Sequence, residues 1–398
     1  MKLLIYSHFF GPSVGGVETV VASLADGLAC HVAETGTRDF EVTLVTETAS
    51  DGREDVSEPY RVIRRPSRWK LVKLVWQNDI VHLAGPAFLP LMLAKMLRKP
   101  TVIEHHGYQS VCPNGLLLLQ PDVEVCPGYF QARKYRRCLS CQAAQIGYIR
   151  SLMSLMLQWP RYLLSRVSSV NIAVSDHVRW RLRLPRTSVI YHGVELPTGE
   201  TDVNPEDSTA MRFAYVGRFV TEKGVRTLLE AARRLSETQE KFELLLIGDG
   251  PLRSELESVT DSTGLRDRLR FLGFLDQRRL EHALRDVSVV IMPTISEETA
   301  GLAALEQMSR GRLVIASAIG GLQEAVGDAG LLFTPGNAAE LADRMRSVLE
   351  NPQLINSLGK AARARASQMF ELSRMIREHA EIYRSLLATS KGNRTESE

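Results

Sequence analysis

The sequence lacks both a hydrophobic run long enough to cross a membrane and a recognisable secretion signal. No window of about 18 residues, the length a spanning helix needs, is apolar and free of charge. Residues 1–7 are apolar but short, and they run into His8 and a glycine-bearing loop as a first β-strand would. The five cysteines are an odd number, which favours a reducing compartment. We therefore expect a cytoplasmic protein.

The chain also lacks the G-x-G-x-x-G fingerprint after its first predicted strand, which disfavours an NAD-dependent oxidoreductase. Hydrophobic residues make up 44% and charged residues 24% of the sequence, as in a soluble globular protein. Its charge is uneven, since residues 1–200 hold 23 Lys and Arg against 17 Asp and Glu. A basic first half suits either an acidic substrate, an anionic membrane surface or a solvated face without a partner.

The 398 residues are too many for one ordinary core, and strand–helix alternation occurs twice. We expect an N-terminal domain over residues 1–197, with a cysteine-rich segment over 107–145, and a second domain over 198–375. A linker rich in Pro, Thr, Asp and Glu precedes the second domain, and residues 376–398 form a closing helix and tail that can pack back on the first domain.

The segment 293–326 follows a buried apolar run and carries two carboxylates, Glu298 and Glu306. About two helical turns separate them, so both can face one cleft. Free backbone N–H groups at Gly301 and Leu302, where a helix begins, would suit a phosphate. Strand, loop, helix and strand form half of a nucleotide-binding α/β unit, which predicts a nucleotide-sugar site.

Two sites are expected in the first half. Gly15 and Gly16 precede a predicted helix, where they allow backbone to approach a ligand or simply make a turn. His105 and His106 end the predicted strand 101–104, at the sheet edge where α/β enzymes keep their chemistry. We favour His106, directly before Gly107, as the functional one.

Four cysteines lie within thirty residues: Cys112, Cys126, Cys138 and Cys141. Four thiolates can enclose a tetrahedral, structural Zn²⁺. Free or redox-active thiols and an iron–sulfur cluster are the alternatives.

Two further stretches are basic or amphipathic. Residues 61–73 hold six basic residues in thirteen positions, which favours a solvated loop or helix face, with contact to acceptor or lipid phosphate as the alternative. Residues 146–167 mix apolar side chains with three arginines, and we expect core packing there in preference to a membrane interface.

Together these motifs resemble the family 4 glycosyltransferases. The matching stretches are Gly-Gly-Val-Glu near the start, His105-His106-Gly107, the run from Val216 to Gly224, Gly-Asp-Gly-Pro at 248–251, and the run from Glu297 to Glu306. The resemblance implies an α/β fold of the GT-B architecture, two Rossmann-like doubly wound domains facing a central cleft. It also implies a retaining hexosyltransferase that takes sugar from a nucleoside-diphosphate sugar, with UDP or GDP favoured.

The resemblance also implies roles for particular residues. Arg218 and Lys223 would hold the donor diphosphate, because no Asp-x-Asp pair is present to bind a metal and fixed cations must neutralise the charge. Glu298 would meet sugar hydroxyls and Glu306 the ribose. Phosphate would also be contacted by the amides of Gly301 and Leu302 and by the first loop at Gly15 and Gly16. Leu272 and Gly273 would lie near the base, and His106 near the sugar.

Thr299-Ala300-Gly301 stands where the family usually has Gly-Phe-Gly, so the sugar stays open, and the cysteine-rich insertion is not general to the family. We expect no catalytic metal and a glycan, glycolipid or other hydroxyl acceptor, as in envelope polysaccharide assembly. A peripheral position at the inner face of the cytoplasmic membrane and a structural zinc are open, and no nucleic acid partner is expected. The alternatives are a nucleotide-sugar epimerase and an inactive GT-B module that binds glycan or protein.

Overall fold

The computed structural model describes residues 1–11, 15–31, 38–50, 58–121, 123–197, 211–238 and 241–395. The chain divides into two compact units. Unit 1 comprises Met1–Pro121, Cys126–Gly193 and Leu372–Glu398, and unit 2 comprises Val194–Glu371 together with Asp122–Val125. Most of the predicted linker, residues 198–210, lies outside the described residues.

Unit 1 is built on a seven-stranded parallel sheet in the order β3-β2-β1-β4-β5-β8-β9. Its order reverses between β1 and β4, the topological switch point at which open α/β sheets bind ligands. Apolar side chains of β1, β4 and β5 are buried on both faces, which suits a parallel sheet covered by helices. The strands are β1 (Lys2–Ser7), β2 (Glu41–Thr46), β3 (Arg61–Arg64), β4 (Ile80–Ala84), β5 (Thr101–His105), β8 (Val170–Ala173) and β9 (Thr187–Val189).

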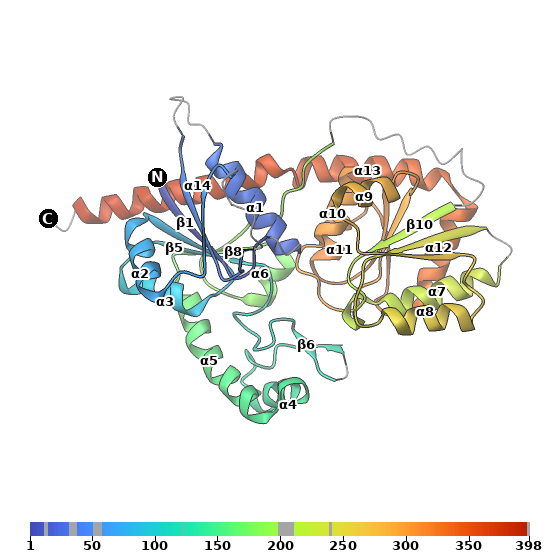
Figure 1. Ribbon diagram of the computed structural model, residues 1–398, viewed down its shortest axis with the longest axis horizontal. Coiled ribbons are helices and arrows are strands. Elements are labelled where there is room, and N and C mark those ends of the chain that lie inside the picture. The colour runs from blue at the N-terminus through green and yellow to red at the C-terminus, as the bar shows by residue number, and fades with distance from the viewer. Residues whose placement is uncertain are drawn as a thin grey trace. The chain divides into compact units, whose positions relative to one another are not determined.

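Helices cover this sheet, and the last helix of the chain is one of them. α14 lies beside α1 and belongs to unit 1, although the chain reaches it only after all of unit 2 (Figure 1). The ring of Tyr383 on α14 is fully buried there. The helices of unit 1 are α1 (Gly16–Ala29), α2 (Arg68–Gln77), α3 (Phe88–Met96), α4 (Tyr135–Ile146), α5 (Tyr148–Arg166), α6 (Asp176–Leu182) and α14 (Leu372–Thr395).

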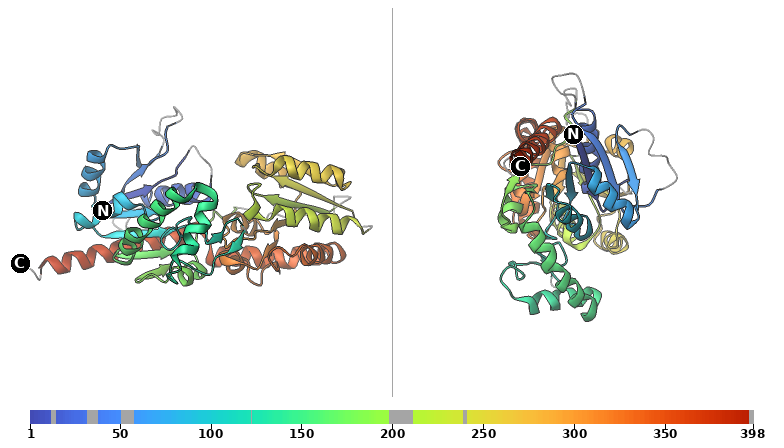
Figure 2. Two further views of the ribbon diagram at one scale, coloured as in Figure 1. Left: turned by 90° about the horizontal axis from the view of Figure 1, so that it is seen from below. Right: turned by 90° about the vertical axis from the view of Figure 1, so that its left-hand side faces the viewer.

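A hairpin of α4 and α5 projects away from the sheet of unit 1, as the views in Figures 1 and 2 agree. The short strands β6 (Leu118–Leu119) and β7 (Glu124–Val125) precede it in the chain and pair with each other. Most large apolar side chains of α5 are exposed, so the expectation that residues 146–167 pack in the core is wrong. Only its polar Ser151, Gln158 and Ser165 are buried.

Unit 2 repeats the plan with a six-stranded parallel sheet in the order β12-β11-β10-β13-β14-β15, which reverses between β10 and β13. Its helices form one apolar core with the strands. The strands are β10 (Met211–Val216), β11 (Phe242–Ile247), β12 (Leu269–Gly273), β13 (Val289–Met292), β14 (Leu313–Ser317) and β15 (Leu331–Phe333), and the helices are η3 (Thr221–Lys223), α7 (Val225–Ser236), α8 (Arg253–Ser262), α9 (Gln277–Ala283), α10 (Leu302–Ser309), α11 (Gly320–Val326), α12 (Ala338–Glu350) and α13 (Gln353–Met369).

For residues 61–73 the expectation of a solvated loop or helix face is confirmed over 65–73, where the basic side chains are exposed, and is wrong over 61–64. The first four residues form β3, whose Val62 and Ile63 pair with β2, and α2 follows. Strand β3 lies at the edge of the sheet, with Arg61 exposed and Arg64 partly buried and donating to the carbonyl of Gly11 at 2.7 Å, so the charge count hid a strand. Among the described helices, none is long and apolar enough to span a membrane.

Candidate functional site

The expected phosphate-binding cations of unit 2 lie on the loop that leaves β10, at the switch point. Gly217 and Arg218 follow β10, and Lys223 ends the short 3-10 helix η3. Glu298 lies on the loop that leaves β13, the strand on the other side of the same switch point. The two loops are joined, because Thr294 donates from its Oγ1 to the carbonyl of Glu222 at 2.8 Å.

Lys223 and Glu298 form a close ion pair between these loops, Nζ to Oε1. Both side chains are partly exposed, at 29% and 23%. Arg218 stands further out, with 73% of its side chain exposed and one guanidinium nitrogen 4.0 Å from Glu222. The hydroxyl of Tyr215 donates to the carbonyl of Arg218 at 2.8 Å and so holds the backbone of Arg218. One exposed cation and one paired cation therefore face solvent at a ligand-binding sheet edge.

Two glycines are required for this arrangement. Gly224 has φ of 67°, and a Cβ there would lie 1.8 Å from the carbonyl oxygen of Pro293. Gly320 has φ of 62°, and a Cβ there would lie 2.5 Å from the carbonyl oxygen of Glu298. Because both positions combine a left-handed backbone with a close approach, any larger residue would push the Glu298 loop away.

The N-terminus of α10 lies directly after Glu298. Gly301 caps the helix in a left-handed conformation with φ of 68° and ψ of 44°, so the amides of Leu302 and its neighbours point out of the first turn. Glu306 lies one turn further and is half-buried. Burial raises the pKa of the Glu306 carboxyl, and the nearby Arg310 opposes that shift.

Leu272 and Gly273 end β12, two strands away from β10 in the sheet. The amide of Gly248 donates to the carbonyl of Gly273 at 2.8 Å, which joins this end to the loop after β11. Leu272 is 37% exposed. An apolar side chain held open beside a glycine with φ of 70° can pack against a flat ring.

In unit 1 a cavity of about 380 Å³ lies at the carboxyl ends of β1, β4 and β5. His106, Gln109 and Arg161 are among its polar lining residues, and the ends of β1 and β4 supply the rest: Ser7, His8, Phe9, Ala84, Gly85, Pro86 and Ala87, with Val17 from α1. Gly15 is the N-cap of α1 and Gly16 its first residue, while residues 12–14 of the same loop lie outside the described residues.

The two adjacent histidines have different surroundings. His105 is fully buried, with Asn171 Oδ1 2.9 Å from its Nε2 and Ser110 Oγ 3.3 Å from its Nδ1. Both of its ring nitrogens are thus used within the unit, and burial lowers its pKa to about 4. His106 instead lines the cavity and contacts His192, Nδ1 to Nε2 at 3.0 Å.

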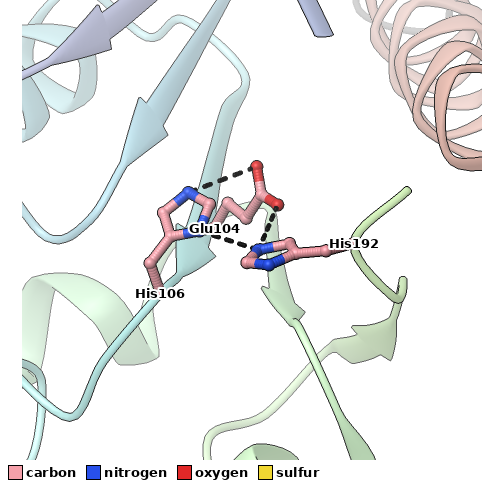
Figure 3. A group of neighbouring side chains, drawn as sticks. All are labelled: Glu104, His106 and His192. Atoms are coloured by element: carbon pink, nitrogen blue, oxygen red, sulfur yellow. Dashed lines mark hydrogen bonds and ion pairs between the residues drawn. The ribbon is translucent and has the colours of Figure 1, made fainter. Parts of the chain in front are cut away.

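Beneath His106 lies Glu104, a fully buried carboxylate that sequence reasoning did not single out (Figure 3). Its Oε2 lies 3.2 Å from Nε2 of His82, 3.5 Å from Nε2 of His379 and 3.6 Å from Nε2 of His106. Its Oε1 lies 4.0 Å from Nε2 of His192. Although burial alone would raise it, the surrounding imidazoles of His106 and His379 hold the pKa of Glu104 well below its usual value.

The hydrogen bonds of the cluster fix one proton position. Nδ1 of His379 lies 2.8 Å from the carbonyl of Met375, which only accepts, so that nitrogen carries a proton. Its Nε2 faces an ionised carboxylate, which also only accepts. Burial lowers the pKa of His82 and of His192, the latter to about 3.

Glu104, His106 and His192 each offer one ligand atom, and these atoms lie within 4.8 Å of one another, a spacing that a divalent cation could use. The contact between His106 and His192 already occupies a nitrogen of each ring. We therefore assign the group to an internal network of ion pairs and hydrogen bonds. A charged residue within the apolar strand 101–105 and a second His-Gly pair at 192–193 were the available sequence signals, whereas nothing pointed to His379.

The four cysteines of the predicted metal site are free thiols that line one small cavity of about 20 Å³. Two of them contact neighbouring polar atoms, because Cys112 donates to Asn114 Oδ1 at 2.9 Å and Cys141 to the carbonyl of Leu118 at 3.6 Å. Burial raises the pKa of the Cys138 thiol to about 12, and the neighbouring cysteines add to that shift. The segment thus brings Cys112, Cys126, Cys138 and Cys141 together from a loop, a strand end and one turn of α4.

Two family models match this chain, one over each half. The model of Glycosyltransferase Family 4 matches residues 14–197, and that of Glycosyl transferases group 1 matches residues 200–365.

Curated relatives are similar over parts of their length. The 2-deoxystreptamine glucosyltransferase of Streptomyces kanamyceticus is 38% identical over 140 residues, which cover 35% of this chain and 36% of that protein. The chain spans about a third to a half of the length of the first curated relatives it matches.

Solved structures match nearly the whole chain. The sucrose-phosphate synthase of Thermosynechococcus elongatus has a TM-score of 0.71 at 23% identity and covers 98% of this chain and 99% of its own. HepE of Anabaena in complex with UDP has a TM-score of 0.72 at 20% identity and covers 97% of this chain and 100% of its own. At these identities the likeness establishes the fold, two Rossmann-like sheets of the GT-B type.

Proposed function

This chain belongs to glycosyltransferase family 4, and on that premise we propose that it transfers a sugar from a nucleoside-diphosphate sugar to a hydroxyl group, with retention of anomeric configuration. The acceptor is a glycan, a glycolipid or another hydroxyl compound. The observation that carries the proposal is the pairing of Lys223 with Glu298 across the switch point of unit 2. A cation for the diphosphate and a carboxylate for sugar hydroxyls are there held next to each other.

In this proposal the donor lies along the strand ends of unit 2. Arg218 and Lys223 neutralise the diphosphate, and the amides of Gly301 and Leu302 at the start of α10 add hydrogen bonds to phosphate oxygens. Glu298 accepts from hydroxyls of the transferred sugar. Glu306 accepts hydrogen bonds from the ribose hydroxyls. The end of β12 at Leu272 and Gly273 contacts the base. The similar HepE of Anabaena was solved in complex with UDP, which supports a nucleotide donor here.

We propose that no metal ion takes part in the transfer, because two side-chain cations and a helix N-terminus converge where the diphosphate would lie. Transfer rates should then be unchanged, within about twofold, by excess EDTA. A loss of activity that Mg²⁺ or Mn²⁺ restores would overturn this part of the proposal.

The transfer itself is proposed to take place on one face of the sugar. The bond from C1 to the phosphate oxygen breaks, the bond from C1 to the acceptor oxygen forms on the same face, and the departing phosphate takes the acceptor's proton. Glu104, the carboxylate nearest to His106, is fully buried among histidines and does not suit a nucleophile that must reach C1. His106 lines the cavity of unit 1, and it is the residue of that unit that we propose to take part in the transfer. A glycosyl adduct found on a digested peptide would overturn this mechanism.

The first test measures thermal unfolding with a panel of UDP-, GDP- and ADP-sugars for wild type and Lys223→Ala. A ligand at a hundredfold excess over its Kd stabilises the native state by about 2.7 kcal/mol. We expect one donor class to raise the unfolding temperature of wild type and not of Lys223→Ala. The matched control is Lys360→Ala, an exposed lysine on α13, which should keep the full shift. No shift with any donor, from folded protein, would favour an inactive binding module.

We also propose a structural Zn²⁺ held by Cys112, Cys126, Cys138 and Cys141. Four thiols that line one cavity supply the closed tetrahedral ligand set that structural zinc takes. Since burial raises the pKa of the Cys138 thiol to about 12, a bound cation is needed to hold that group as a thiolate.

Metal analysis of protein purified without chelator tests the zinc site. We expect one zinc per chain in wild type, well below half of that in Cys138→Ser, and full content in Cys30→Ser, which removes the exposed cysteine at the end of α1. Because protons compete for the thiolates, zinc should be released more readily at pH 5 than at pH 8. Zinc-free, fully folded wild-type protein in which all five thiols titrate would contradict the site.

A further inference from the structure

Helix α5 buries polar side chains and exposes apolar ones, the reverse of a helix that packs on a protein core. Its three buried residues, Ser151, Gln158 and Ser165, are all polar. Its large apolar residues face outward instead, and six of them are between 44% and 77% exposed: Ile149, Leu152, Met153, Met156, Leu157 and Leu163. These positions recur at spacings of three and four residues, so they form one face of the helix.

The orientation of the helix is fixed by its polar face. Ser151 donates from Oγ to the carbonyl of Leu139 at 2.9 Å, and Gln158 donates from Nε2 to the carbonyl of Gln109 at 3.0 Å. Ser165 Oγ lies 3.0 Å from Ser110 Oγ. A rotation that hid the apolar face would break these buried hydrogen bonds, so the apolar face is held toward solvent.

The charges around this face have one sign. Residues 126–175 contain seven Arg and Lys and no Asp or Glu. Arg150, Arg161 and Arg166 lie on α5 itself, and the other four, at positions 133, 134, 136 and 137, lie just before α4 and in its first turn. An apolar face on a segment whose charges are all positive complements a surface with an apolar interior and anionic headgroups.

We infer that the outer face of α5 docks into the headgroup region of an anionic lipid bilayer. The apolar side chains enter the boundary of the acyl chains, and the arginines contact lipid phosphates. An exposed cluster of apolar side chains marks an interaction surface, and the one-sided charge selects an anionic bilayer over a second copy of this equally basic segment.

Co-sedimentation with vesicles tests the docking face. Wild type should bind phosphatidylcholine vesicles that contain phosphatidylglycerol, bind pure phosphatidylcholine vesicles weakly, and lose binding as salt rises. Met156→Glu places an anion in the middle of the face and should lower the bound fraction at least fivefold. Val259→Glu, which adds the same charge at an exposed apolar position of α8, should bind like wild type.

Two outcomes would overturn the inference. Equal binding of wild type and Met156→Glu to the anionic vesicles would show that the face is not the contact. Concentration-dependent dimers of wild type in analytical ultracentrifugation, absent in Met156→Glu, would show that a second copy covers it. Unchanged thermal unfolding of Met156→Glu confirms that the variant is folded. Vesicle binding needs no sugar donor, so its result is independent of the proposed transfer.

The inner side of the same helix carries a second, independent observation. Arg161 lines the cavity of about 380 Å³ together with His106 and Gln109. In the part of the chain that the structure describes, no carboxylate pairs with this guanidinium, and its buried Nε has no hydrogen-bond partner. Its Nη1 lies 3.4 Å from Gln158 Oε1, a neutral amide oxygen. A half-buried cation without an anion is costly unless a ligand supplies one.

We propose that Arg161 binds a phosphate group of the acceptor, which makes the acceptor a phosphorylated or lipid-phosphate-linked compound. This second proposal rests on the proposed transfer function, since it names the chemistry of the acceptor for that reaction at the cavity of unit 1. The planar guanidinium can take two phosphate oxygens at once.

The probe is inorganic pyrophosphate, added in the Lys223→Ala background so that the donor site contributes little. Pyrophosphate should raise the unfolding temperature of Lys223→Ala and not that of Lys223→Ala with Arg161→Gln. No stabilisation of Lys223→Ala, or equal stabilisation of both, would overturn the role of Arg161. The sugar-donor shift of Arg161→Gln alone should equal that of wild type, so failure of the donor site would be seen separately.

Discussion

At the scale of single residues, Glu104 is the unusual feature of unit 1. An ionised carboxylate moved into a protein interior costs several kcal/mol unless partners compensate it. Here four histidines surround it, from β4, α14 and the segments that follow β5 and β9. The rings of His106 and His379 hold the pKa of Glu104 well below its usual value, against the effect of burial. Tyr383 extends the network, with its hydroxyl 2.9 Å from Nδ1 of His82. The carboxylate therefore links the central strand β5 to the last helix of the chain.

Replacing Glu104 by Gln tests that link. The substitution removes the buried carboxylate that four imidazoles face, so we expect the free energy of unfolding, from urea denaturation, to fall by about 3 kcal/mol. The control Glu381→Gln changes an exposed carboxyl on α14, the helix that carries His379. It should change the free energy of unfolding by less than about 0.5 kcal/mol. The donor-induced shift should persist in Glu104→Gln, because Lys223 and Glu298 lie in unit 2. If Glu104→Gln were as stable as wild type, the network would add no net stability.

At the scale of elements, sequence patterns predicted most strands of both sheets and the loops that bear the candidate site. Those predictions worked because continuous apolar runs followed by glycine mark buried parallel strands and their ligand-binding ends. Gly224 and Gly320, for example, occur where another backbone approaches too closely for a Cβ to fit. Local chemistry of this kind is visible in the sequence.

Other elements were misread because their environment is not local. Periodicity shows that α5 is amphipathic but not which face packs inward, and here the buried hydrogen bonds of Ser151 and Gln158 decide it. The basic count over residues 61–73 hid β3, since edge strands tolerate charge. His379 reaches Glu104 from the far end of the sequence, and no short-range pattern reports such a contact.

At the scale of the whole molecule, each unit places its candidate residues at the reversal point of its own sheet. In unit 1 the cavity lies at the ends of β1, β4 and β5, and in unit 2 Lys223 and Glu298 follow β10 and β13. Helix α14 returns the chain to unit 1 after unit 2 is complete. Duplication of one plan thus yields two ligand-binding edges with different chemistry, one with imidazoles and one with cations and carboxylates.

The buried histidines of unit 1 predict how stability depends on pH. Burial lowers the pKa of His105 to about 4 and of His192 to about 3, whereas an unfolded histidine titrates near 6.5. Below pH 6.5 the unfolded chain therefore binds more protons than the folded chain. The contribution of the two buried histidines to the free energy of unfolding is complete above that pH and is lost as pH falls. At pH 5 each histidine should cost about 2 kcal/mol relative to pH 8.

Unfolding of unit 1 followed by urea denaturation at pH 8 and pH 5 checks this dependence. We expect the pH-induced loss to shrink by about 2 kcal/mol in His192→Gln, which cannot titrate, and to stay unchanged in His282→Gln, an exposed histidine of α9. Identical pH dependence in wild type and His192→Gln would contradict the assignment of a neutral buried ring.

The central claim is that unit 2 presents a nucleoside-diphosphate sugar whose sugar is then transferred. The most direct measurement incubates purified protein with each radiolabelled nucleotide sugar and a mixed glycan and lipid extract, and counts label in the acceptor fraction. We predict incorporation from one donor, reduced about 10²- to 10³-fold in Lys223→Ala and unchanged in Lys360→Ala. Folded, donor-binding protein that transfers no label from any donor, or that converts the donor's sugar without an acceptor, would contradict the claim.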